Sequence, residues 1–154
     1  MRPTRWTDLL AAIVVAGAIV YLMLRIGYDS LPPLGYLTAA PIAVLAVIEF
    51  VIARRVRGVV RRDPNAKPMT AISIARCAAL GKASALVGAA AVGAVLGLFG
   101  RVLPDASRVS AAASDARVGT AVLVVSIALA AAGIYLERAG IHPGETPRNP
   151  SPSR

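Results

Sequence analysis

Long apolar segments, separated by short charged or proline-rich stretches, are the feature that most constrains this sequence. Four of them run over residues 8–28, 34–53, 69–102 and 118–137. A bilayer-spanning helix needs about 20 predominantly apolar residues, and each segment is long enough. A soluble core would instead distribute its apolar side chains at a helical or strand period. The pattern predicts an all-α fold, an integral membrane bundle of four transmembrane helices spanning residues 1–138.

The two ends of the chain are interpreted in the same terms. The first segment resembles a signal peptide, but its apolar run is longer than the roughly 7–15 residues of such a peptide, and no small-x-small cleavage site follows it. We therefore expect a retained signal anchor. Residues 139–154 contain four prolines among polar residues, and such a segment buries too little apolar surface to fold alone. We expect a disordered, proline-rich cytoplasmic tail.

The net charge of +9 indicates how the chain is oriented. Basic residues lie mainly at the ends of the apolar segments, where they orient a membrane protein and contact anionic lipid headgroups. With the amino terminus inside, eleven Lys and Arg residues fall on the cytoplasmic side and four on the other. The positive-inside rule predicts a multi-pass inner (plasma) membrane protein with both termini in the cytoplasm. The partners expected from this are the bilayer and its anionic headgroups, not nucleic acid.

The most basic stretch is predicted to be a cytoplasmic loop between the second and third helices. Either it only fixes the orientation, or it docks onto anionic lipid or an acidic protein. Its basic residues are Arg54, Arg55, Arg57, Arg61, Arg62 and Lys67.

Glu49 is the only charged residue of the second apolar segment, near its cytoplasmic end. An intramembrane carboxylate is costly unless it is paired or faces water, and Lys82 and Arg76 lie at a similar depth on the third helix. We consider three roles for this candidate charge pair: a structural ion pair, a proton or ion path, or two side chains that extend separately to the headgroup layer.

The third segment carries a small residue at every fourth position, which permits close approach of helix backbones in lipid. We expect one continuous helix from near Met69 past Leu98, with this helix-packing face more buried than Leu86, Val95 and Leu96. The face consists of Gly81, Ala85, Ala89, Gly93 and Gly97.

The run Arg76-Cys-Ala-Ala-Leu-Gly-Lys82-Ala-Ser-Ala-Leu-Val-Gly88, followed by Gly93, resembles the actinobacterial membrane proteins of domain-of-unknown-function family 3180. The similarity covers roughly residues 5–136 and includes the Arg54-Arg55-Val56-Arg57 end of the second helix. It implies a four-helix inner-membrane protein of unknown activity, often encoded near folate-pathway genes. It assigns no catalytic or ligand residue to this chain.

The chain has one cysteine and one histidine, and no phosphate loop or nucleophile motif is present, so we expect no catalytic residue, metal or cofactor. The favoured function is a structural or interaction module, not an enzyme, that binds a membrane protein partner or another copy of itself. The alternative is a small proton- or cation-coupled transporter subunit that uses Glu49, with Pro41 letting the second helix flex.

Overall fold

The computed structural model describes residues 4–27, 35, 37, 39–61, 69–105 and 110–140. These residues form four long helices, α1 (Trp6–Gly27), α2 (Ala39–Val60), α3 (Ala71–Val102) and α4 (Ser110–Gly140), with a short 3-10 helix, η3 (Leu103–Asp105), after α3. The fold is therefore all-helical. The predicted tail lies outside the described residues, except for Ala139 and Gly140, which end α4.

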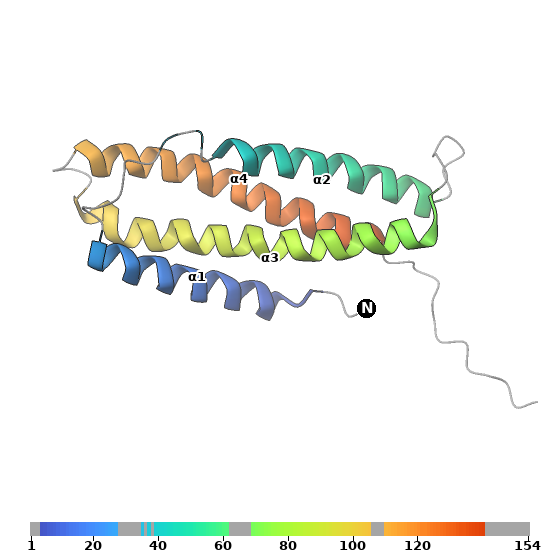
Figure 1. The fold of residues 1–154 in the computed structure, drawn as a ribbon, viewed down its shortest axis with the longest axis horizontal. Coiled ribbons are helices and arrows are strands. Elements are labelled where there is room, and N and C mark those ends of the chain that lie inside the picture. The colour runs from blue at the N-terminus through green and yellow to red at the C-terminus, as the bar shows by residue number, and fades with distance from the viewer. Residues whose placement is uncertain are drawn as a thin grey trace, which may run out of the picture.

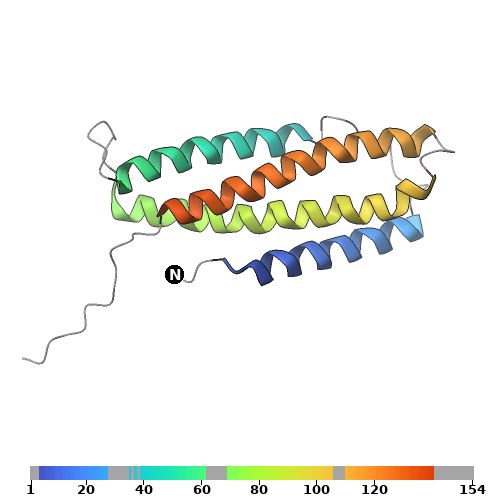
Figure 2. The same ribbon diagram turned by 180° about the vertical axis from the view of Figure 1, so that it is seen from behind.

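The helices form an open row in the order α1, α3, α4, α2, as both ribbon views show (Figures 1 and 2). In the described residues, α1 packs along α3, α3 along α4, and α4 along α2, whereas α1 and α2 do not meet. Helices that follow one another in the chain run in opposite directions, so α2 and α4 end where α3 begins. The two edge helices therefore each pack against one main neighbour only.

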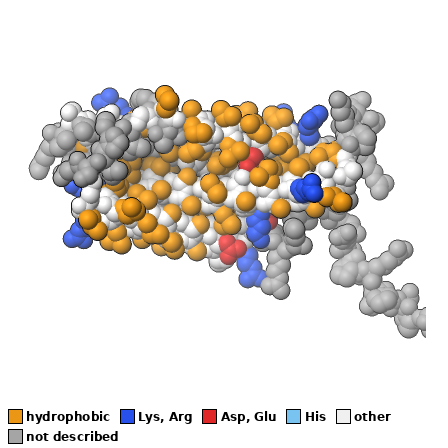
Figure 3. Space-filling view, in the orientation of Figure 1, with side chains coloured by type: hydrophobic (Ala, Val, Ile, Leu, Met, Phe, Trp, Pro, Cys, Tyr) orange, Lys and Arg blue, Asp and Glu red, His pale blue; other side chains and the backbone are white. Residues whose placement is uncertain are grey.

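Three of the four helices are long and apolar enough to cross a membrane: Trp6–Gly27, Ile72–Val102 and Ala112–Gly140. Hydrophobic side chains predominate along the face drawn in Figure 3, and Lys and Arg lie mainly toward its ends. The second helix is not among the three, because its described part contains Glu49 together with Arg54, Arg55 and Arg57. The structure thus supports a membrane-compatible helical fold.

The third helix is continuous over 32 residues, which is about 48 Å. Its amino-terminal cap is Thr70, whose hydroxyl oxygen accepts a hydrogen bond from the Ser73 backbone N–H at 3.3 Å. A length of 48 Å exceeds the roughly 30 Å hydrocarbon layer, so α3 must tilt or protrude if it crosses a membrane.

Three helix boundaries differ by five or more residues from the sequence-based prediction, and the first is the start of α2, at Ala39 and not at residue 34. The second helix does not end at residue 53 but continues through three arginines to Val60, because Ala53 and Val56 remain buried against the neighbouring helices. The fourth helix begins at Ser110, eight residues earlier than expected. Alanine is the strongest helix former, and Ala112 packs into a core cluster, so this polar stretch is helical.

The flexing of the second helix expected at Pro41 has no basis in this fold. The helix begins at Ala39, so Pro41 lies in the first turn, where a missing backbone N–H breaks no intrahelical hydrogen bond.

Candidate functional site

One face of α2 is buried, and a carboxylate lies in the middle of it. The buried residues are Ala46, Glu49, Ala53 and Val56, spaced by three or four so that they share one side of the helix. The Glu49 side chain is 0% exposed. The Glu49 carboxylate therefore lies among three apolar residues, at the centre of the surface by which α2 packs.

The hydroxyl of Ser84, on α3, lies beside the Glu49 carboxylate. Neither carboxylate oxygen has a hydrogen-bond partner among the described residues, so Lys82 and Arg76 do not hydrogen-bond to it. The reason is angular: residues two apart on a helix do not share a face, so Lys82 points away from the side that Ser84 presents. Arg76 is exposed, and Lys82 is half-buried and engaged in an interaction of its own.

The small-residue face of α3 is buried at all five positions, and its first part meets α4. A Cβ atom added at Gly81 would lie 2.7 Å from the Gly133 carbonyl oxygen and 2.7 Å from the Glu137 backbone nitrogen. A Cβ added at Gly133 would lie 2.5 Å from the Ala85 nitrogen. All three distances are below any ordinary carbon contact, so the backbones of α3 and α4 approach as closely as glycine allows.

The second part of the same face meets α1. A Cβ added at Gly93 would overlap the Ile13 carbonyl oxygen, and one added at Gly97 would overlap the Gly17 carbonyl oxygen. Each step of four residues turns about 40° around a helix with 3.6 residues per turn, so the face rotates from α4 to α1 along its length. Ala89 lies where the neighbouring helix changes from α4 to α1, and it packs in a cluster with Leu9 of α1. One row of small residues thus joins α3 to two helices.

Sequence reasoning missed the partners of this row. The glycines Gly17, Gly88 and Gly133 also make backbone approaches that leave no room for a side chain. Glycines next to alanines within the apolar segments were the available signal. The three residues expected to be less buried than this face differ in exposure. Leu96 is 47% exposed and Leu86 is half-buried. Val95 is only 6% exposed and packs with Val118 and Val122 of α4. Two faces of α3 are covered there, so Val95 is only slightly more exposed than Ala85 (0%) and Ala89 (3%), in the predicted order but with a small difference.

Two arginines of the predicted basic loop lie on α2 and contact aromatic rings. The Arg54 guanidinium lies 5.2 Å from the centroid of Phe50, and the Arg57 guanidinium lies 5.3 Å from that of Tyr135. Arg57 also donates a hydrogen bond of 3.0 Å to the Tyr135 hydroxyl, and the two rings stack at 5.9 Å. Arg55 and Arg61 are exposed, whereas Arg62 and Lys67 lie outside the described residues.

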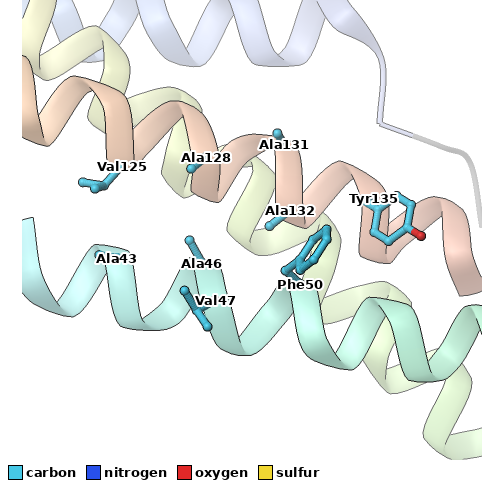
Figure 4. A pocket seen from close by; sticks show the side chains of 9 residues that line it. All are labelled: Ala43, Ala46, Val47, Phe50, Val125, Ala128, Ala131, Ala132 and Tyr135. Atoms are coloured by element: carbon cyan, nitrogen blue, oxygen red, sulfur yellow. The ribbon is translucent and has the colours of Figure 1, made fainter.

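An apolar groove between α2 and α4 runs up to these two rings (Figure 4). Its volume is about 590 Å³. Small side chains form both walls, and Phe50 and Tyr135 stand together toward one end, with the tyrosine hydroxyl turned away from the alanines. The residues that line it are Ala43, Ala46, Val47, Phe50, Val125, Ala128, Ala131, Ala132 and Tyr135.

A second buried carboxylate, Glu137, has a hydrogen-bond partner, in contrast to Glu49. Its Oε1 atom accepts a hydrogen bond of 2.7 Å from the backbone N–H of Thr4, just before α1. The contact ties the start of the chain to the end of α4. In the described part of the chain, no three His, Cys, Asp or Glu side chains lie together in a way that could hold a metal ion.

These features define a helical protein with membrane-compatible helices, whose central helix is packed through glycine and alanine. The family model described as "Protein of unknown function (DUF3180)" matches residues 9–143. The chain belongs to this family, as its resemblance predicted. No curated protein and no solved structure matches it significantly.

Proposed function

We propose that the chain is a four-span membrane protein, with both termini in the cytoplasm, that acts as a structural or interaction module and not as an enzyme. The alternating direction of the helices along the chain is compatible with four crossings, since it brings the ends of α2 and α4 and the start of α3 to one end. The arginines of α2 then lie on the cytoplasmic side, in agreement with the positive-inside rule.

The orientation predicts a specific result with reporter fusions. A reporter that is active only in the cytoplasm should work when fused after Gly140 or before Trp6, and a reporter active only outside should work in the connector between α3 and α4. Exchanging the two reporters at each site is the control. Activity of the outside reporter after Gly140 would contradict the proposed topology.

The observation that carries the interaction proposal is the uneven burial of the row. Only 11% of the most apolar stretch of α1 is buried, against 44% for α3. Large apolar side chains such as Val15 and Leu22 therefore point outward from an edge helix whose main neighbour is α3. Such a face can accept another helix without disturbing the core, because the glycine contacts hold α1 to α3 independently.

Photo-crosslinking in intact cells tests this. A photoreactive side chain at Val15 or Leu22 should give a discrete adduct, with a second copy or with one membrane protein. The control is Val87, which is 58% exposed on the central helix α3. Adducts at Val87 equal to those at Val15, or none from α1, would contradict an α1 interface. Unaided turnover of a metabolite by the purified protein would overturn the non-enzymatic assignment.

One observation favours a second candidate function, a small transporter subunit coupled to protons or cations. The Glu49 carboxylate is fully buried and lacks a hydrogen-bond partner in the described residues. Unsatisfied buried carboxylates are expensive and mark ion pathways in membrane proteins. Substitution of Glu49 by Gln or Met separates this role from a purely structural one.

A further inference from the structure

We propose that the groove between α2 and α4 binds one acyl chain of an anionic phospholipid, whose phosphate is held by Arg54 and Arg57. The inference goes beyond the module proposed above, although it depends on α2 crossing the membrane. It rests on the shape and composition of the groove and on the charges at its end.

The groove has the composition of an acyl-chain site. Every lining side chain is apolar apart from the Tyr135 hydroxyl, and five of the nine are alanine. Small side chains on both helices leave about 590 Å³ between them. In a bilayer such a space is filled by a lipid chain, since water finds no hydrogen-bond partner there and an empty apolar space loses dispersion contacts.

The depth of the groove matches one leaflet. On α4 its lining extends from Val125 to Tyr135, ten residues or about 15 Å along the axis. Half of the hydrocarbon layer of roughly 30 Å is also about 15 Å. A chain that fills the groove therefore has its headgroup close to the level of Tyr135.

The charges complete the site at that level. Arg54 lies over Phe50 and Arg57 over Tyr135, and these two rings are part of the groove lining. The ring contacts hold the two exposed guanidinium groups above the same end of the groove. Arginine matches phosphate geometry with paired N–H donors, so the groove is complementary to a lipid with an anionic headgroup.

A helix of a partner or of a second copy fits less well. The groove ends at two exposed arginines. An anionic phospholipid carries a phosphate at the end of its acyl chains and so places a negative group there by its own structure. A helix does so only if its sequence puts an acidic residue at that position.

The experiment uses the full chain in nanodiscs of phosphatidylglycerol and phosphatidylcholine in equal amounts, with retained lipids counted by native mass spectrometry. The wild type should retain one phosphatidylglycerol in preference to phosphatidylcholine. The double variant Arg54→Gln/Arg57→Gln should lose about 30-fold of that preference, because each basic residue near the surface contributes about 1 kcal/mol. The charge-matched control is Arg55→Gln/Arg61→Gln, which should keep it.

A second variant tests the apolar part separately. Ala128→Leu fills the groove and should abolish retention of either lipid, whereas Ala18→Leu, on the exposed side of α1, should leave it unchanged. Equal losses in the two arginine variants would mean general charge attraction and overturn the site. So would undiminished retention in Ala128→Leu, or a structure with a helix of a second copy or partner in the groove. The reporter fusions show independently whether α2 crosses the membrane, so failure of the lipid site and failure of the topology are distinguishable.

Discussion

Replacing Gly93 with leucine is expected to separate α1 from α3 and to produce the largest loss of stability in the chain. A Cβ atom at this position would already overlap the Ile13 carbonyl oxygen, and Gly17 faces the same point of α3. Backbone atoms of two packed helices cannot move aside as a flexible side chain can. Overpacking typically costs about 1–3 kcal/mol and sometimes more, and we expect about 3 kcal/mol or more here.

The measurement is thermal unfolding in detergent, followed by a thiol-reactive fluorogenic dye that labels Cys77, the only cysteine of the chain. By the scaling for domains of this size, the midpoint should fall by roughly 6–12 °C. Gly93→Ala should lie between the wild type and Gly93→Leu.

The matched control lies two turns away on the same helix. A Cβ at Gly100 would meet only the Tyr21 ring, at 3.4 Å, and alanine gains about 1 kcal/mol of helix propensity over glycine. Gly100→Ala should therefore be neutral or stabilising. If it lowers the midpoint as much as Gly93→Ala, the spacing of α1 and α3 is not limited by backbone contact.

Some sequence signals locate helices and buried faces but do not predict how the helices are arranged. Apolar length identified the helical segments, and the spacing of Gly81 to Gly97 identified a buried face of α3. Neither signal predicts which helix is the neighbour. The packing of α3 against α1 and α4 depends on glycines distributed over these three helices, among them Gly17 and Gly133, whose role is evident only when they lie opposite other backbones.

Helix boundaries were less predictable, for a related reason. Apolar length locates the part of a helix that suits a membrane, whereas the helix itself continues for as long as its backbone is favourable and one face is buried. The arginines of α2 and the alanine- and serine-rich start of α4 continue their helices in this way. For Glu49, depth in the membrane suggested Lys82 as a partner, but direction around α3 brings Ser84 to it instead.

Glu49→Met is expected to stabilise the protein, because it removes a fully buried carboxylate that has no hydrogen-bond partner in the described part of the chain. An unsatisfied buried polar group costs about 1–3 kcal/mol, more when it is charged, and methionine fills a similar volume without that cost. The unfolding midpoint of Glu49→Gln should fall between those of the wild type and Glu49→Met, since this variant removes the charge but keeps an amide without a hydrogen-bond partner. Both are measured by the Cys77-labelling midpoint.

The matched control is Glu137, a buried carboxylate that has a hydrogen-bond donor, and it should respond with the opposite sign. Glu137→Met leaves the Thr4 backbone N–H, now bonded at 2.7 Å, without its acceptor, so we expect a loss of about 1–3 kcal/mol.

If Glu49→Met instead lowers the midpoint as Glu137→Met does, the Glu49 carboxylate has a structural partner and the case for an ion-carrying role is lost. If Glu49→Met and Glu49→Gln both raise it, the carboxylate costs stability, and a selective loss of proton or cation flux into sealed vesicles in both variants would give the reason for its presence. Flux that is unchanged in Glu49→Gln would exclude the transporter function while leaving the stability result intact.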